Sequence, residues 1–272
     1  MLDSSFAKRS LIARGRTAEL YSWEEGRVLK LFYNWCQAEW IDREIMANAE
    51  LASGQLPIPH LFGTVDIEDR RGLIFERVDG KSMLSQLQSK PWQVVAIARQ
   101  FAGLQVEMHK IRASRLPDLR AALRHTIERV EKLSETQKAA VLKKLELLPD
   151  GDCLCHFDFH PDQVLISASG PVVIDWLTAF RGAPAADVAR SSIILAFARA
   201  PYLKGPRAAL LALFQKLFYS SYRRQYFKLN PAVTESEVRA WMLPVAAGRL
   251  QENIEGEEKL LLNFIAKELA QD

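Results

Sequence analysis

The sequence predicts an α+β protein with two lobes, a small sheet-rich lobe followed by a larger and mainly helical one. Over about the first eighty residues, short apolar runs separated by turn residues indicate strands around a single helix. After Asp79-Gly80 the spacing of apolar residues becomes helical. A strand-rich island at residues 153–175 interrupts these helices. We therefore expect an N-terminal lobe over residues 1–80 and a C-terminal lobe over residues 81–272.

The elements of the first lobe follow from local patterns. Arg14-Gly15-Arg16 indicates a turn between two strands. Ile41, Ile45 and Ala49 repeat at helical spacing and predict a helix over residues 39–52. The expected strands of this lobe are residues 10–12, 18–22, 27–32, 61–66 and 72–78. In the second lobe, the expected helices are residues 92–111, 118–133, 135–148, 185–198, 206–227, 235–250 and 257–269.

Composition excludes several classes of protein. Apolar residues make up 49% and charged residues 25% of the 272 residues, as in an ordinary globular domain. The net charge of +3 is too small to indicate a nucleic-acid or membrane partner. Three cysteines in a chain of this length do not form a disulfide framework. The first ten residues lack a signal-type apolar run, and the apolar run 193–198 is too short to span a bilayer. We expect a cytoplasmic protein, whose oligomeric state no pattern indicates.

The island carries the most specific chemical pattern. Residues 156–163 read His-Phe-Asp-Phe-His-Pro-Asp-Gln, and the strand that follows this loop ends in Ile-Asp175-Trp. Asp158 and Asp175 thus lie 17 residues apart on an expected hairpin-like element. Phosphoryl transfer requires one carboxylate to accept the proton of a hydroxyl group, and a second carboxylate with an amide oxygen to hold Mg²⁺. Asp158 is the candidate for the carboxylate that accepts the proton, and Asp175 and Gln163 are the candidates for the metal ligands.

A lysine in the first lobe supports the same chemistry independently. Lys30 lies inside the apolar strand 28–32, where an unpaired ammonium group is costly to bury. It therefore requires an anionic partner. Glu44 on the following helix is the preferred candidate, and Glu39, about one and a half turns earlier, is the alternative.

The two motifs of the island resemble those of the aminoglycoside phosphotransferase family. His156-x-Asp158-x4-Gln163 followed by Ile-Asp175-Trp is similar to the family's H-G-D-x-H-x-x-N and I-D-[WF], and the resemblance extends over nearly the whole chain. It implies a protein-kinase-like fold with an antiparallel sheet in the N-terminal lobe. It also implies ATP, or GTP, bound with Mg²⁺ in the cleft between the lobes. Phe157 replaces the usual glycine, and Gln163 replaces asparagine, which alters the reach of the amide oxygen toward the metal.

The same resemblance implies roles for residues of the first lobe. The stretch around Gly15 is similar to the family's G-R-T-A-E-x-Y turn, and it contains one glycine where a full phosphate loop has several. Lys30 is expected to contact the α- and β-phosphates while paired with Glu44. The remaining expected nucleotide contacts are Gly15, Arg16 and Thr17 over the phosphates, and the backbone of Glu76 and Val78 at adenine.

Several other patterns have a structural interpretation. Asp187 is expected to orient local backbone, and His109 to be a packing residue. The acidic run 252–258 is expected to be a solvated helix start rather than a wall for a cationic acceptor. The aromatic and basic segment 222–228 is expected to end a helix rather than contact RNA.

The leading functional hypothesis is therefore a phosphotransferase acting on a hydroxyl group of a small molecule such as an aminoglycoside, amino-alcohol or sugar. A nucleotide-binding regulator with little catalysis is the main alternative, because Gln163 and the glycine-poor loop depart from the family's pattern. Zinc binding or RNA binding is a further alternative. The residues that could hold zinc are Cys153, Cys155, His156, Asp158 and His160.

Overall fold

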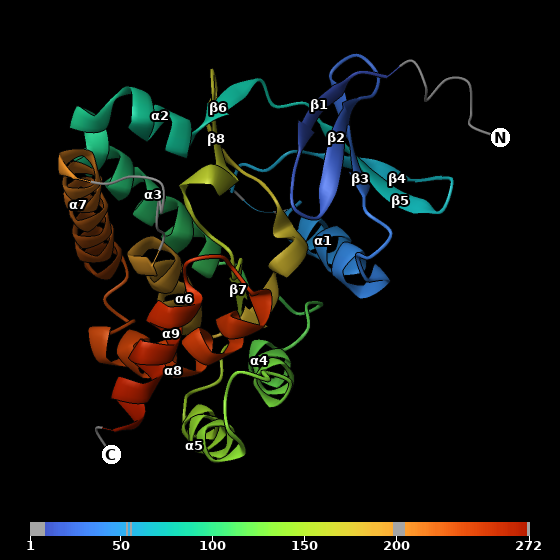
Figure 1. Ribbon diagram of the computed structural model, residues 1–272. Coiled ribbons are helices and arrows are strands. Elements are labelled where there is room, and N and C mark those ends of the chain that lie inside the picture. Colours follow the sequence, from blue (N-terminus) through green and yellow to red (C-terminus); the bar gives the residue numbers. More distant parts are fainter. Residues whose placement is uncertain (1–8, 53, 55, 198–204, 271–272) are drawn as a thin grey trace. The chain divides into compact units, whose positions relative to one another are not determined.

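A computed structural model gives the architecture of the chain (Figure 1). The described residues are 9–52, 54, 56–197 and 205–270. Contacts divide the chain into two compact units. The first unit comprises Met1–Ser82 and Val164–Thr178, and the second comprises Met83–Gln163 and Ala179–Asp272. The chain thus returns to the first unit after residue 163.

The first unit contains a five-stranded antiparallel sheet with the order β1-β2-β3-β5-β4. Its strands are β1 (Leu11–Arg14), β2 (Ala18–Ser22), β3 (Arg27–Phe32), β4 (Leu61–Ile67) and β5 (Arg70–Glu76). Helix α1 (Ala38–Leu51) follows β3. The predicted ranges for β2 and β3 are confirmed. The range for β4 differs by one residue at its end, and those for β1 and β5 differ by one or two residues at both ends.

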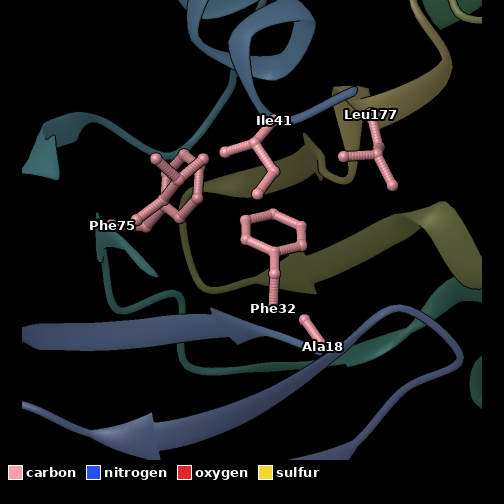
Figure 2. Close-up of a cluster of buried hydrophobic side chains, with 6 residues drawn as sticks. Ala18, Phe32, Ile41, Phe75 and Leu177 are labelled. Carbon is pink, nitrogen blue, oxygen red and sulfur yellow. The ribbon is translucent and has the colours of Figure 1, made fainter. Parts of the chain in front are cut away.

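The core of the first unit joins the sheet, α1 and the returning segment. Figure 2 shows Phe32 pointing from β3 toward Ile41 of α1, with Phe75 of β5 and Leu177 on either side. Leu177 lies in the short 3-10 turn η4 (Trp176–Thr178), which packs against α1. Because Leu177 is anchored in this core, the residue two positions earlier, Asp175, is held beside the sheet.

The strand-rich island divides between the two units: a hairpin does lie between Asp158 and Asp175, but β7 is not part of it. β8 (Val164–Ser167) and β9 (Gly170–Val173) form a hairpin in the first unit, and β6 (Gly80–Ser82) pairs with β8. β7 (Cys153–Cys155) belongs to the second unit and pairs with β10 (Phe180–Gly182). β6 and β10 were not predicted, because three residues are too few to show an alternating pattern.

The second unit is mainly helical, and α4, α5 and α8 begin at side-chain caps. Asp118 caps α4 through the amide of Ala121, and the pairs Ser134–Gln137 and Thr234–Glu237 form capping boxes at α5 and α8. The helices are α2 (Met83–Ser89), α3 (Val94–His109), α4 (Leu119–Glu128), α5 (Glu135–Glu146), α6 (Pro184–Phe197), α7 (Pro206–Leu229), α8 (Glu235–Arg249) and α9 (Glu258–Leu269). Ala198, at the end of the predicted helix 185–198, lies outside the described residues.

Helix α6 forms the centre of the second unit. Its residues from Ala185 to Ile194 are all buried, and it packs against α7, α8 and β7. Polar residues in such a position must find hydrogen-bond partners within the protein. The α+β class with a mainly helical second part, expected from the sequence, is confirmed. Within the described ranges, no helix combines the length and apolar character needed to cross a bilayer.

Candidate active site

Three charged residues from distant segments meet in the first unit. Lys30 lies in the middle of β3, and its Nζ donates to both carboxylate oxygens of Glu44 at 2.8 Å. The same Nζ donates to Oδ1 of Asp175 at 2.7 Å. The pairing of Lys30 with Glu44 predicted from the sequence is therefore confirmed, whereas Glu39 is exposed. Asp175 follows Lys30 by 145 residues, so the contact depends on the return of the chain to this unit.

The burial of this cluster determines its electrostatics. Lys30 is 9% exposed and Glu44 1% exposed. Burial disfavours the ammonium, but the carboxylates of Asp175 and Glu44 outweigh it, so the pKa of Lys30 is raised above its ordinary value. Asp175, in the left-handed region at φ 64°, has a side chain that is one-third exposed. The cluster thus presents a permanent cation next to an accessible carboxylate.

The predicted phosphate-covering residues form the turn between β1 and β2. The amide of Gly15 donates to the carbonyl of Ala18 at 2.8 Å, and the carbonyl of Thr17 accepts from the amide of Tyr33 at 3.0 Å. A Cβ at Gly15 would lie 3.3 Å from the Ala18 carbonyl oxygen, which favours glycine at this close approach. Gly15 and Arg16 are exposed.

The predicted adenine-contacting residues lie where β5 ends. The amide of Glu76 donates to the carbonyl of His60 at 2.8 Å, and a Glu76 carboxylate oxygen accepts from the amide of His60 at 3.2 Å. Val78 is half-buried in the segment between β5 and β6. Their backbone contacts with a nucleotide stay a prediction.

Asp158 belongs to the second unit, in the loop that follows β7. Its side chain is 31% exposed, with His160 Nε2 3.7 Å from Oδ2 and Arg190 Nη2 3.6 Å from Oδ1. Burial alone would raise the pKa of Asp158, but His160 and Arg190 favour the charged form, and the net effect lowers this pKa below its ordinary value. Asp158 is therefore ionised at neutral pH. Gln163 is the last residue of the turn η3 (Pro161–Gln163), where its backbone amide donates to the backbone carbonyl of His160 at 2.9 Å.

Asp187 of α6 supports the loop of Asp158. One of its carboxylate oxygens accepts from the backbone amide of Phe157 at 2.6 Å, and the other accepts from the side chain of Gln105 at 2.8 Å. The expectation that Asp187 orients local backbone is confirmed. His109 is buried as expected, but it also hydrogen-bonds, with Nε2 3.0 Å from Asp187 Oδ2. A single histidine on an apolar helix face does not indicate such a partner.

Replacing Asp187 with asparagine is expected to lower the free energy of unfolding by about 1–3 kcal/mol at pH 7, because a hydrogen-bonded buried charge is lost. Burial raises the pKa of Asp187, but His109, Gln105 and the Phe157 amide outweigh it and lower this pKa. A lowered pKa contributes stability above the unfolded carboxyl pKa of about 4, and this contribution disappears as the pH falls toward the folded value. Urea unfolding, measured from pH 7 to pH 3, should show the unfolding free energies of the wild type and Asp187→Asn approaching each other below about pH 4. The exposed Asp150, changed to asparagine, is the control.

Two buried arginines near Asp158 were missed by the sequence analysis. Arg190 of α6 and Arg249 of α8 are 3% and 5% exposed. They pair with the acidic run: Arg190 binds Glu252, and Arg249 binds Glu252 at 3.3 Å and Glu257 at 2.6 Å. The run is therefore not simply a solvated helix start. An arginine inside the apolar stretch of α6 was the signal available in the sequence.

The zinc and RNA alternatives find no support in the part of the chain that the structure describes. Within it, no three His, Cys, Asp or Glu side chains are grouped so that they could hold a metal ion. Cys153 and Cys155 are free thiols, and Cys155 is buried. In the segment 222–228, Tyr222 and Tyr226 are fully buried, so their rings are not available to stack on bases.

Comparison with solved structures defines the class of this fold. The chain is similar to a thermostable mutant of the aminoglycoside phosphotransferase APH(4)-Ia in a ternary complex with AMP-PNP and hygromycin B, at 18% identity and a TM-score of 0.67, over 97% of this chain and 93% of that one. It is also similar to an aminoglycoside-3'-phosphotransferase of type VIII (19% identity, TM-score 0.61, 90% and 92% covered). Choline kinase from Cryptosporidium parvum matches at 15% identity and a TM-score of 0.53, over 97% and 88%. The predicted protein-kinase-like fold is therefore confirmed.

A family model identifies the chain more specifically. The model of the phosphotransferase enzyme family matches residues 15–226, which is most of the chain, and the protein belongs to that family. The resemblance to aminoglycoside phosphotransferases is confirmed. Among curated proteins, no sequence gives a significant match. Family and fold together support a small-molecule phosphotransferase.

Proposed function

We propose that this protein transfers the γ-phosphate of ATP to a hydroxyl group of a small molecule, with Mg²⁺ as the cofactor. GTP is the alternative donor. The observation that carries the proposal is the contact of Lys30 with both Glu44 and Asp175. A buried lysine held by a helix glutamate, next to a carboxylate that follows a strand, is the arrangement that protein kinases use around a nucleoside triphosphate.

The first unit supplies the proposed nucleotide contacts. Lys30 binds the α- and β-phosphates, and its raised pKa keeps it cationic at any physiological pH. Backbone amides of the turn containing Gly15, Arg16 and Thr17 cover the phosphates. The backbone of Glu76 and Val78 binds the adenine base.

Asp175 and Gln163 are the proposed Mg²⁺ ligands, and their chemistry fits the ion. Mg²⁺ prefers carboxylate, amide and water oxygens, and the accessible carboxylate of Asp175 is oriented by Lys30 through Oδ1. When bound, the ion neutralises phosphate charge. Gln163 provides an amide oxygen on a side chain one methylene longer than the family's asparagine.

Asp158 is the proposed catalytic residue. Its lowered pKa makes it a carboxylate that accepts a hydrogen bond from the acceptor hydroxyl and orients the oxygen for attack. A new bond forms between this oxygen and the γ-phosphorus, the bond to the β–γ bridging oxygen breaks, and ADP leaves. A weak base suffices, because the hydroxyl proton is lost only as the oxygen–phosphorus bond forms.

The acceptor class follows only from relatives: one similar structure contains hygromycin B, and another similar protein is a choline kinase. A panel of aminoglycosides, amino-alcohols and sugars, assayed by ADP release with and without Mg²⁺, tests the proposal directly. Thermal shift with ATP or GTP tests nucleotide binding separately. Absence of both nucleotide binding and ADP release across the panel would contradict it.

A catalytically attenuated nucleotide-binding regulator is the second candidate, because Gln163 stands where the family has asparagine. If the longer side chain impairs Mg²⁺ ligation, Gln163→Asn is expected to raise ADP release by about tenfold or more, since one ligand contact worth about 1.4 kcal/mol changes a rate tenfold. Gln100→Asn, at an exposed glutamine of α3, is the matched control. Unchanged ADP release in Gln163→Asn would argue against attenuation at this position.

A further inference from the structure

Arg190 connects three parts of the second unit around Asp158. It lies on α6, three residues after Asp187, and its Nε donates to the carbonyl of Phe157 at 3.0 Å. Its Nη2 lies 3.6 Å from Oδ1 of Asp158 and also donates to Glu252. The guanidinium carbon lies 5.4 Å from the centre of the Phe157 ring. A single buried side chain therefore contacts the residue before Asp158, Asp158 itself and the turn η5 (Leu250–Glu252).

The position of Arg190 is itself maintained by a series of alternating charges. Glu252 accepts from Arg190 through one carboxylate oxygen and from Arg249 at 3.3 Å through the other. Arg249 makes two further hydrogen bonds to Glu257, at 2.6 and 2.9 Å. Planar guanidinium groups hold carboxylates in a defined orientation, which a single ammonium cannot do. The series extends from the start of α9 to the loop of Asp158.

We propose that Arg190 is a positioning residue for Asp158, and that Glu252 holds Arg190 in the orientation this requires. The inference deepens the proposed function and rests on the assignment of Asp158 as the residue that orients the acceptor hydroxyl. Phe157, immediately before Asp158, has a left-handed backbone at φ 60°, a conformation disfavoured for a phenylalanine. The bonds from Arg190 to the Phe157 carbonyl and from the Phe157 amide to Asp187 stabilise that conformation from both sides.

The contacts of Arg190 also keep Asp158 in its charged form. The charged or titratable groups around Asp158 are Arg190, Arg249, Glu252, His156 and His160. Arg190 both lies close to the Asp158 carboxylate and donates a hydrogen bond to the backbone of the loop, at the Phe157 carbonyl. Loss of the Arg190 charge is therefore expected to raise the pKa of Asp158. It is also expected to leave the Asp158 carboxylate less firmly held in one orientation.

The test uses the full-length protein and three variants, Arg190→Gln, Arg190→Lys and Glu252→Gln. The ¹³Cγ resonance of Asp158, assigned with Asp158→Asn, is titrated in protein labelled at aspartate. Removing an opposite charge at this distance is expected to raise the Asp158 midpoint by about one pH unit or more in Arg190→Gln. In Arg190→Lys the Asp158 midpoint should lie between those of the wild type and Arg190→Gln, because lysine keeps the positive charge but lacks the planar guanidinium group. Arg124→Met, which removes an exposed arginine paired with Glu146, should leave the midpoint unchanged.

A second measurement separates this inference from the proposed function. ATP hydrolysis with water as acceptor is followed by ADP release, where Arg190→Gln should lower kcat by about tenfold or more with little change in KM for ATP. If the wild type neither binds nucleotide nor releases ADP with water or any acceptor of the panel, the proposed function fails, and the NMR titration still decides the role of Arg190. A folded Arg190→Gln protein with an unchanged Asp158 midpoint would overturn the inference. If Arg190→Gln does not fold, kcat for ATP hydrolysis in Arg190→Lys and Glu252→Gln decides. The first variant keeps the charge without the planar fork, and the second keeps the shape of the pair without its charge. Wild-type kcat in both variants would overturn the inference.

Discussion

Replacing Asp158 with asparagine is expected to lower phosphoryl transfer by about 10²–10⁴-fold, the usual contribution of a positioned acid–base residue, while nucleotide binding is retained. Asparagine preserves the size of the side chain but cannot accept the hydroxyl proton. Asp158→Ala should have the same effect on turnover. Because the lowered pKa keeps Asp158 ionised, the loss should be similar at every pH from 6 to about 9.

The measurement is ADP release with the best acceptor of the panel, together with the thermal shift that ATP and Mg²⁺ produce. Asp162→Asn is the matched control, since Asp162 is an exposed aspartate in the same loop. Wild-type turnover in Asp158→Asn would refute the assignment of the catalytic residue. Loss of the ATP-induced shift in that variant would instead mean that Asp158 serves nucleotide binding.

Replacing Lys30 with methionine is expected to have the largest effect on stability, with a loss of about 3–5 kcal/mol in the free energy of unfolding. Breaking one side of a buried ion pair leaves the other charge without compensation, and Glu44 is almost fully buried. The same variant should lose most of the thermal shift caused by ATP, because the proposed phosphate contact is absent. Urea unfolding and thermal shift measure the two effects separately.

A double variant separates the structural role of Lys30 from its proposed role in nucleotide binding. In Lys30→Met with Glu44→Gln the buried unpaired carboxylate is removed, so more than half of the lost stability should return. The ATP-induced shift should not return, since no ammonium is present. Lys81→Met, at an exposed lysine of β6, is the control. Recovery of ATP binding in the double variant would show that Lys30 is only a structural residue.

Local patterns in the sequence predicted much of the candidate site. Lys30 inside an apolar strand required a buried anion, and Glu44 on the next helix was the nearest suitable residue, as the structure confirms. Asp175 could be placed at the end of a strand, but its hydrogen bond to Lys30 could not be predicted from spacing. That contact depends on the anchoring of Leu177 in the core of the first unit, which involves residues far apart in the chain.

Other features could not be predicted, because they depend on long-range pairing. The short strand β7 pairs with β10 and not with its sequence neighbour β8, and three residues contain too little information to choose a partner. The apolar stretch around Arg190 indicates that this arginine is buried and needs an anionic partner, but it does not indicate which anion. The acidic run offered several partners of similar chemistry, and only its folded position shows that Glu252 accepts from Arg190.

The sequence by itself determined the α+β class, most of the strands and helices, and the candidate residues that we propose to bind phosphate, Mg²⁺ and a hydroxyl group. These depend on spacing and residue chemistry within short windows. Only the tertiary structure decided which charges meet: Lys30 with Asp175, and Arg190 with Asp158 and Glu252. The physical reason is that a buried charge pairs with whichever opposite charge the packing of the core brings within hydrogen-bonding distance. That packing depends on residues from the whole chain.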